Sequence, residues 1–278
     1  MDLSIASSFF DADEILDGYT GAYLFTAHST PHDDTTSSGS TVRRKTLVTQ
    51  PDARVPARRV ISFNGETWIV GNNNPDSFQG SVIRRNFGLK KSSGLFELLT
   101  PGQAAADAPG RAMHAQRDYF RDTTDTQTSS DWDTMWSVYC PFNEPVKKGM
   151  YLQLGSSLMR IRNLYPSVDE FLVAEADELD ADARQRIEFI KKAKVNLVAG
   201  TQDGESVFVD ALQFEIPKSY SFRVEAEAST TAGDRSVVIP MGDYTPATGA
   251  VFLMQGVQWR VMTAVPLQDA WSLHVRRV

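Results

Sequence analysis

The strongest constraint on how this chain folds is a short pattern that occurs three times. In each copy an alternating apolar segment reaches a glycine, and the segment after it carries a large apolar residue three positions further on. The copies cover residues 60–70, 150–161 and 251–261. Their turn glycines are Gly65, Gly155 and Gly256, and their large apolar residues are Trp68, Leu158 and Trp259. Three copies of one hairpin pattern predict that most of the chain is β-structure.

The sequence around each hairpin repeats as well. Two prolines precede each glycine, and a further apolar segment follows it, centred on Ile83, Val173 or Leu273. These centres lie 18, 18 and 17 residues after their glycines. The glycines are 90 and 101 residues apart, which is too far for a solenoid repeat. We therefore expect a mainly β protein of repeated β-hairpin modules, each a small barrel or sandwich, with one or two short helices.

The local chemistry of the first copy supports a hairpin. Ile61 and Phe63 alternate with polar residues, which is the period of a half-buried strand. Asn64 and Gly65 form a favoured two-residue turn because both residues tolerate positive φ. The large residues Trp68, Leu158 and Trp259 are expected to pack on one face of each hairpin, while the prolines mark edges and loops.

The chain is predicted to divide into six segments. Residues 180–194 are predicted to be helical because acidic residues begin the segment and lysines end it, which suits the helix dipole. A second short helix is expected to end at Gly18. The segments are an N-terminal segment with a polar loop (1–41), a first β unit (42–100), a connection (101–131), a second β unit (132–179), a helix with a β-hairpin insertion (180–219) and a third β unit (220–278).

Composition excludes several classes of protein. The net charge of −7 disfavours a surface that coats nucleic acid, although it does not exclude a local basic ring. The single Cys140 excludes an internal disulfide framework and a cysteine-rich zinc site. No run approaches the ~20 apolar residues of a membrane helix, and the first residues lack the basic start and apolar core of a signal peptide. We expect a protein made in a reducing cytoplasm.

The search for catalytic chemistry finds no complete motif. His28, His32, Asp33 and Asp34 form a sequence cluster, but Pro31 and a Ser/Thr run indicate a solvated loop. Cys140 lies in an apolar segment, which favours a buried structural thiol. The acidic clusters at residues 131–133 and 177–180 read as a strand entry and a helix start rather than as a glycosidase pair. We therefore expect a non-enzymatic protein with no catalytic residues, metal site or cofactor.

Basic doublets are the more informative polar feature. Arg58-Arg59 and Lys147-Lys148 occupy the same place in the repeat, just before the first hairpin strand. Arg84-Arg85 and Arg276-Arg277 both follow the closing apolar segment. One interpretation is solvated strand ends or salt bridges between subunits. The alternative is a basic ring that faces DNA phosphates in an oligomer, with Arg58, Arg59, Lys147, Lys148, Arg84 and Arg85 as the candidate channel-facing residues.

The hairpin, proline loop and closing strand together resemble the small β modules of tailed-phage head–tail joining proteins. The matching stretches are residues 63–70, 154–161 and 255–261, with closing strands at 82–84, 171–174 and 272–275. That family includes head-completion (stopper), tail-terminator and tail-nozzle proteins. An ordinary stopper is about one module long, so a chain with three modules more closely resembles a nozzle or tail-hub protein of a short-tailed phage.

The resemblance implies a structural virion protein with no catalytic residues. It implies a cyclic homo-oligomer, with a hexamer favoured, that surrounds the DNA channel and docks on a portal or adaptor and on other tail proteins. Passing double-stranded DNA would be contacted without sequence specificity, and no membrane would be involved. The protein would be assembled in the host cytoplasm and reside in the virion. Residues 28–41 and 122–131 are the candidate docking or gating loops because they are long and polar.

Two other functions remain open at this stage. The chain also suits another β-rich virion component, such as a minor tail, baseplate or capsid-decoration protein. A carbohydrate-binding β module is the less favoured alternative, because exposed tryptophans stack on sugars. The tryptophans concerned are Trp68, Trp132, Trp136, Trp259 and Trp271, and their positions in alternating segments favour core packing.

Overall fold

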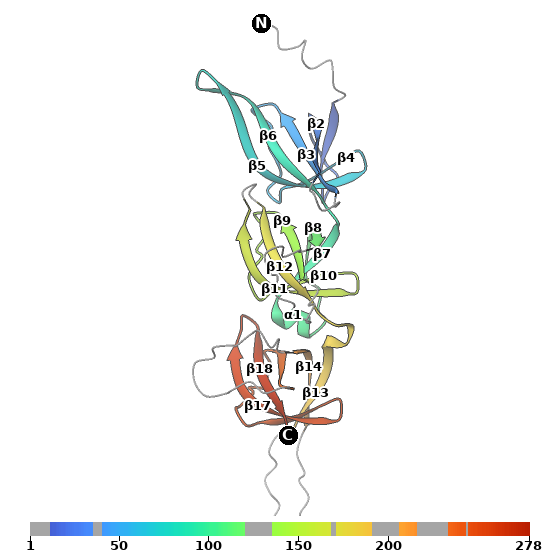
Figure 1. Cartoon of the computed structure of the whole chain (residues 1–278), viewed down its shortest axis with the longest axis vertical. Coiled ribbons are helices and arrows are strands. Elements are labelled where there is room, and N and C mark those ends of the chain that lie inside the picture. The colour runs from blue at the N-terminus through green and yellow to red at the C-terminus, as the bar shows by residue number, and fades with distance from the viewer. Residues whose placement is uncertain are drawn as a thin grey trace, which may run out of the picture. The chain divides into compact units, whose positions relative to one another are not determined.

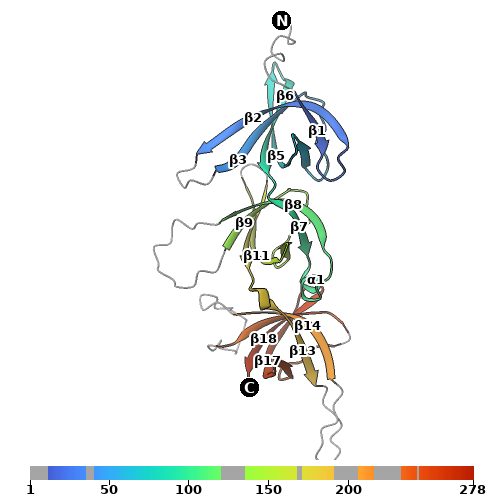
Figure 2. The same ribbon diagram turned by 90° about the vertical axis from the view of Figure 1, so that its right-hand side faces the viewer.

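A computed structural model describes residues 12–35, 41–119, 135–167, 171–190, 206–215, 233–242 and 244–278. Within these ranges the chain is almost entirely antiparallel β-structure (Figure 1 and Figure 2). One short α-helix, α1 (Pro101–Ala105), and one 3-10 turn, η2 (Ala181–Ala183), are the helical elements of the described ranges. None of the helices described here is long and apolar enough to cross a membrane.

The strands form three closed six-stranded barrels. The first barrel contains β1 (Asp13–Asp17), β2 (Tyr23–Thr35), β3 (Thr41–Thr49), β4 (Val60–Phe63), β5 (Glu66–Phe78) and β6 (Ser81–Lys91). The second contains β7 (Gly94–Leu99), β8 (Arg111–Tyr119), β9 (Met135–Cys140), β10 (Tyr151–Leu154), β11 (Ser157–Pro166) and β12 (Leu172–Glu178). The third contains β13 (Arg184–Ile190), β14 (Ser206–Glu215), β15 (Arg235–Pro240), β16 (Val251–Met254), β17 (Val257–Pro266) and β18 (Ala270–Arg277).

All three barrels have the same strand order. Numbered within each barrel, the order is 1-2-3-6-5-4, so the third strand pairs with the sixth and the first with the fourth. Closure removes the free sheet edges that an open sheet of this size would expose. The expectation of a mainly β protein made of repeated small barrels is confirmed.

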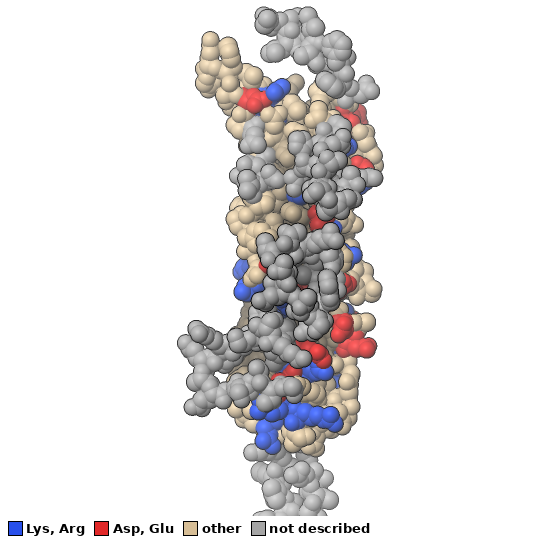
Figure 3. All heavy atoms as spheres, in the orientation of Figure 1, with Lys and Arg blue, Asp and Glu red and all other residues tan. Residues whose placement is uncertain are grey.

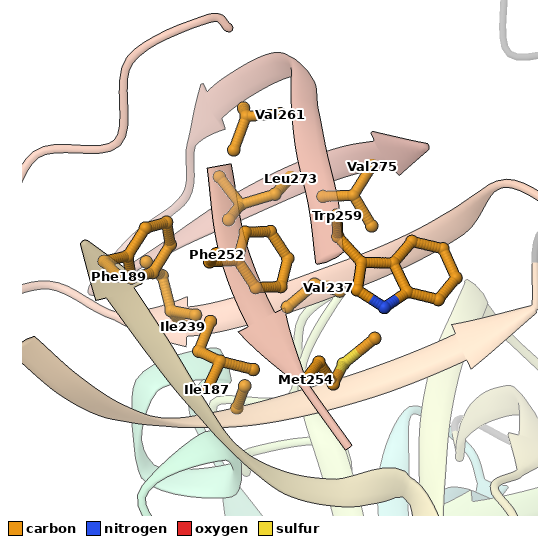
Figure 4. Packing of buried hydrophobic residues seen from close by; sticks show 11 residues of the cluster. Ile187, Phe189, Val237, Ile239, Phe252, Met254, Trp259, Val261, Leu273 and Val275 are labelled. Carbon is orange, nitrogen blue, oxygen red and sulfur yellow. The ribbon is translucent and has the colours of Figure 1, made fainter. Parts of the chain in front are cut away.

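Alternation along the strands fills the barrel cores. In the third barrel Ile187 and Phe189 of β13 point inward with Phe252 of β16 and Trp259 of β17 (Figure 4). The ring centroids of Phe189 and Phe252 lie 5.0 Å apart, and those of Phe189 and Tyr244 lie 4.2 Å apart. Each large side chain removed from water in this way contributes about 1.5–3 kcal/mol. The first barrel has an equivalent core around Phe63 and Trp68, whose rings stack 5.7 Å apart.

The three turn glycines join the fourth and fifth strands of their barrels, in two turn geometries. Asn64 and Gly65 both have positive φ (50° and 72°), as do Gln255 and Gly256 (53° and 74°), which is the pattern of a type I′ turn. In the second barrel Leu154 pairs with Ser157, so Gly155 (φ 60°) is the first central residue and Ser156 the second. That pattern is type II′.

Because Gly155 is the first and not the second residue of its turn, the residue three positions after it falls one place earlier on the fifth strand. Trp68 lies opposite Ile61 and Trp259 opposite Phe252, but the equivalent pair in the second barrel is Met159 with Leu152. Trp68 and Trp259 are buried in their barrel cores. Leu158 is also buried, but in a separate cluster with α1 and residues of the third barrel. A one-residue slip moves a side chain to the opposite face of a strand, so Met159 takes the position at which Leu158 was expected.

The expected helices at residues 180–194 and before Gly18 are wrong where the structure describes them. Residues 181–183 form the 3-10 turn η2, and β13 follows directly. Ile187 and Phe189 are buried, with Glu188 half-buried between them, because the third barrel needs a strand between β14 and β16 to close. Residues 13–17 likewise form β1, which closes the first barrel between β2 and β4.

The barrels also begin earlier in the chain than the expected β units. β1 and β2 lie in the segment assigned to an N-terminal extension. β7 and β8 belong to the second barrel, although they were assigned to the first unit and to a connection, and β13 and β14 belong to the third barrel rather than to an insertion. The first strand of each barrel, β1, β7 or β13, also pairs with the fourth strand, which is distant in sequence. This closing pair, rather than a local pattern, determines where each barrel begins.

The first closing strand also differs from expectation. Residues 82 and 83 do not lie in the core but near the tip of the long β5–β6 hairpin, where Val82 and Ile83 are exposed. Phe87 lies opposite Leu47 of the neighbouring strand and is buried, as Leu273 lies opposite Val237 in the third barrel. Phe87 therefore holds the core position that the repeat assigned to Ile83.

Contacts between residues divide the chain into two compact units. The first comprises residues 1–96, 112–148 and 161–177, and the second comprises residues 97–111, 149–160 and 178–278. The first unit contains the whole first barrel, and the second contains α1 and the whole third barrel. Elements of the first and second barrels meet in the first unit, and elements of the second and third barrels meet in the second unit. We call these two regions the first and second junctions.

Candidate nucleic-acid interface

Arg58 is held in the junction inside the first unit. Its Nε donates to Glu144 Oε1 at 2.6 Å, and its Nη2 donates to the carbonyl oxygen of Ala112 at 2.5 Å. The Glu144 side chain is 1% exposed. The guanidinium carbon lies 3.7 Å from the centroid of the Tyr19 ring. Arg58 thus neutralises a buried carboxylate, and its binding groups are directed at protein rather than at solvent.

Arg59 and Arg84 are also engaged with protein atoms. Arg59 Nη1 donates to the Gly71 carbonyl at 3.0 Å. Arg84 forms an ion pair with Asp76 across the β5–β6 hairpin, and Asp76 also accepts a hydrogen bond from Asn86 at 3.1 Å. These two hydrogen bonds from Arg84 and Asn86 lower the pKa of the Asp76 carboxyl. A DNA phosphate would have to compete with Asp76 for the Arg84 side chain.

Lys147 and Lys148 differ from the arginines before β4, because both side chains are exposed in the loop that leads into β10. Of the six candidate channel-facing residues, this doublet is the one best placed for a polyanion. The loop that carries the lysines contacts the loop that carries Arg58 and Arg59, because Arg58 binds Glu144 and Asn143 donates to the Ala57 carbonyl at 2.9 Å. Arg84 and Arg85 lie on the β5–β6 hairpin.

A further basic group lies on the third barrel, where Arg260, which is not part of a doublet, joins the doublet Arg276-Arg277. Arg260 lies directly opposite Arg276, and Arg277 lies opposite Trp259. Arg276 is bound by the buried carboxylate of Asp234 at 3.0 Å, whereas Arg260 and Arg277 are exposed. Lys and Arg side chains gather over this barrel in Figure 3. Arg260 carries no signal in the sequence, because only the β17–β18 pairing brings it to the arginine doublet.

Lys90 provides a second polar contact in the first junction. This residue of β6 is 1% exposed, and its ammonium lies 3.8 Å from the Tyr139 ring centroid and 5.7 Å from that of Phe171. The two rings meet edge to face at 6.4 Å. A cation over aromatic faces is attracted by the ring quadrupole, most strongly where water is excluded. Lys90 therefore ties the first barrel to β9 and β12 of the second.

The junction in the second unit is more apolar. Leu99, Ala104 and Ala105 from the α1 region pack with Tyr151 and Leu158, and the third barrel contributes Leu212, Val238 and Ala270 to the same cluster. Arg184 lies at its margin, where it pairs with Asp107 at 2.9 Å and donates to Gln153 Oε1 at 2.8 Å. Arg160 lies 4.7 Å from the Phe214 ring centroid.

The sequence candidates for chemistry do not converge. Burial raises the pKa of the Cys140 thiol, and the nearby Glu144 carboxylate raises it further, so the thiolate is disfavoured. Among the residues that the structure describes, no group of three or more His, Cys, Asp and Glu side chains is placed to hold a metal ion. Asp177 pairs with Arg162, and Glu178 accepts a hydrogen bond from Ser157 at 2.5 Å. Residues 131–133 lie outside the described ranges.

The remaining candidates are the tryptophans and the polar loops. Trp68 and Trp259 are buried, Trp271 packs against the third core, and Trp136 lies under the Arg117 guanidinium at 4.1 Å, which leaves little flat aromatic surface for a sugar ring. Of the candidate docking loops, residues 28–35 belong to β2, whereas residues 36–40 and 122–131 lie outside the described ranges, as does Trp132.

Three comparisons with known proteins were made. No protein-family model matches the chain, no curated protein matches it, and no solved structure matches it.

Proposed function

We propose that this chain is a structural virion protein of the tailed-phage head–tail interface, of the tail-nozzle, hub or head-completion type. In this role copies of the chain form a ring around the DNA channel and dock on a portal or adaptor. The observation that carries the proposal is the tandem repetition of one closed barrel with one strand order. Small β modules of this kind are what the resemblance to head–tail joining proteins implies.

The distribution of polar chemistry supports a structural role. The buried charged groups Glu144 and Lys90 make contacts between elements of successive barrels. The third barrel's buried Asp234 is bound by Arg276 and by His274 at 2.8 Å. These charged groups thus stabilise contacts between successive barrels or between strands of one barrel, which suits an assembly protein.

Lys147 and Lys148 are the residues that we propose to approach passing DNA. Both are exposed and neither belongs to a junction contact described above. Charge reversal of both lysines should reduce DNA retention in assembled particles while leaving the fold and ring formation intact. Unchanged packaging and retention would remove these residues from the DNA-contact proposal.

The native mass of the purified chain, alone and mixed with a candidate portal, tests the whole proposal. A hexamer, another closed ring, or a ring formed only on the portal is expected. A monomer or trimer indifferent to the portal would contradict the head–tail role and favour a different β-rich virion component.

A further inference from the structure

The hairpins between the fifth and sixth strands share one role in the second and third barrels. In the third barrel this hairpin turns at residues 267–269, and Asp269 reaches α1 of the second barrel. Its Oδ1 accepts a hydrogen bond from the Gly102 N–H at 2.9 Å, and its Oδ2 accepts one from the Thr100 hydroxyl. The next residue, Ala270, is buried with Ala104 and Ala105. The tip of the third barrel therefore docks on the preceding barrel.

The second barrel repeats this arrangement inside the first unit. Its hairpin leaves β11 at Pro166 and re-enters the sheet at Phe171, which is buried beneath Lys90 of the first barrel. The backbone N–H of Ser167 donates to the Phe171 carbonyl at 2.8 Å, as that of Leu267 donates to the Ala270 carbonyl at 2.8 Å in the third barrel. In both barrels the residue that follows the hairpin turn, Phe171 or Ala270, is buried against an element of the preceding barrel.

The first barrel has the same hairpin, but no barrel precedes it among the residues that the structure describes. Its tip, residues 78–83, turns at Gln79 and Gly80, which both have positive φ. Phe78 is 64% exposed, Val82 40% and Ile83 52%. β6 pairs with β3 only from Arg85 onward, so residues 81–84 pair with β5 alone. The hairpin extends past the neighbouring strands of its barrel (Figure 1).

An isolated two-stranded ribbon with exposed apolar side chains gains little stability from its own contacts. Exposed apolar groups gathered at one place indicate an interaction site. We propose that the first-barrel tip docks on the third barrel of a second copy of this chain, as the other two tips dock on the barrels that precede them.

The third barrel offers a surface whose chemistry resembles that of the two surfaces on which the other tips dock. The two acceptor surfaces within the chain present hydrogen-bond donors or a cation to the tip: the α1 N–H and hydroxyl groups to Asp269, and the Lys90 ammonium to Phe171. The third barrel presents the exposed guanidinium groups of Arg260 and Arg277. Either guanidinium is suited to stack on the exposed ring of Phe78.

One exposed apolar side chain, Val278, lies beside these arginines. Its N–H donates a hydrogen bond to the Gln258 carbonyl at 3.0 Å. Val278, Arg260 and Arg277 thus lie together at the end of the β17–β18 pair opposite the Asp269 tip. We call this surface the third-barrel end. The exposed Phe208 does not belong to this group, because β14 lies across the barrel from β17 and its ring faces the Arg186 guanidinium at 5.2 Å.

The contact joins two different surfaces, so it is heterologous and generates a ring or an open chain of copies. It does not require the head–tail role, because the only partner is a second copy. It also differs from the proposed DNA contact, which involves Lys147 and Lys148.

Sedimentation velocity of the full chain from about 1 to about 100 µM tests the proposal by mass action. The wild type should associate as its concentration rises. Phe78→Asp/Ile83→Asp in the tip and Arg260→Glu/Arg277→Glu in the third-barrel end should each weaken association by roughly tenfold or more. The matched controls are Leu95→Asp, which changes an exposed apolar residue on β7, and Lys147→Glu/Lys148→Glu. Both controls should associate like the wild type.

Mixing the two defective variants gives the sharpest test. The tip variant keeps an intact third-barrel end, and the end variant keeps an intact tip, so an equimolar mixture should form a heterodimer and nothing larger. Circular dichroism and thermal unfolding establish that each variant is folded, and Val82→Lys is a milder second tip variant.

A wild type that stays monomeric over this range would overturn the proposal, as would association that survives the tip substitutions or a mixture that remains monomeric. A monomer that still joins a portal ring would overturn this contact and leave the head–tail role standing. A chain that self-associates through its tips but does not bind the portal would support this contact and contradict the head–tail role.

Discussion

Single residues in this protein show how one barrel design tolerates different side chains. Gly149 and Gly249 occupy the same place, two residues before the fourth strand of their barrels, whereas Arg59 directly precedes its fourth strand, and all three have positive φ. Their φ values are 50°, 86° and 84°. Glycine adopts this conformation without steric cost, whereas a residue with a Cβ is destabilised in it. The first barrel accepts that cost at Arg59, whose side chain bonds the Gly71 carbonyl.

Gly249→Ala tests this cost directly. An added Cβ would meet nothing within 4 Å, so the penalty comes from the backbone conformation alone. We expect a loss of about 1 kcal/mol in the free energy of unfolding, measured by urea denaturation. Gly242→Ala is the matched control, because that site is equally open but lacks positive φ. Equal effects at the two sites would contradict the argument.

The ion pair of Arg58 and Glu144 makes a second prediction at this scale. Arg58→Ala leaves the Glu144 carboxylate buried without its main cation, so we expect a loss of about 3 kcal/mol in the free energy of unfolding. Adding Glu144→Gln should recover part of that loss, because the amide is neutral. The exposed Arg54, changed to Ala, should alter stability by less than about 0.5 kcal/mol. Failure of the double variant to recover stability would argue against the pairing.

At the scale of elements, the hairpins do two jobs. The hairpins of the fourth and fifth strands have tight two-residue turns, while those of the fifth and sixth strands in the second and third barrels contact the preceding barrel. α1 is the receiving element in the second unit. Thr100 caps it by accepting a hydrogen bond from the Gln103 N–H, and Gln103 in turn accepts one from the Thr100 N–H. This capping box orients the N–H of Gly102 toward Asp269.

Gly102→Ala should disturb this contact. The new Cβ would lie 2.6 Å from the Asp269 carbonyl oxygen and 2.8 Å from its Oδ2, closer than real Cβ contacts allow. Because a backbone atom is involved, the hairpin must move, and we expect a loss of about 2 kcal/mol in the free energy of unfolding. Gly88→Ala on β6 is the control, since a Cβ there meets open space. A Gly102 variant as stable as the Gly88 variant would show that the contact is loose.

At the scale of the whole molecule, stability depends on junctions as well as on barrel cores. The junction in the first unit relies on charged and aromatic groups, including the Arg58, Tyr19 and His114 side chains. The junction in the second unit relies on an apolar cluster around α1. The two junctions should therefore respond differently to pH.

His114 makes the first junction sensitive to acid. Burial lowers the pKa of its imidazole from the usual 6.5, the nearby Arg58 charge lowers it further, and a backbone hydrogen bond to Gly94 opposes them. As pH falls through 6.5, the unfolded chain takes up a proton that the folded chain still resists, so the free energy of unfolding decreases.

We expect His114→Gln to flatten this decrease between about pH 7.5 and about pH 5.5, as measured by urea denaturation at each pH. The wild type and the variant should then differ in slope and not only in absolute stability. Parallel curves would mean that another group carries the pH dependence.

Much of the hairpin architecture could be predicted because its causes are local. The period-two alternation, the Asn64-Gly65 turn and the flanking prolines act over a few residues, so they indicate strands and turns without knowledge of the rest of the chain. The choice between strand and helix at residues 184–190 was not local. Ile187 and Phe189 share one face of a strand, whereas Ala183, Ile187 and Ile190 share one face of a helix, so the segment fits both periods and the need to close a barrel decided between them.

Local sequence patterns predict even less of the candidate site than of the fold. The sequence by itself determined that the chain is built from three related β modules, because each module's pattern lies in a continuous stretch. Only the tertiary structure decided that Arg58 meets Glu144, 86 residues away, and that Arg260 lies opposite Arg276. It also decided that Val82 and Ile83 lie on an exposed tip, because a strand's apolar residues are buried only where another strand or barrel covers them.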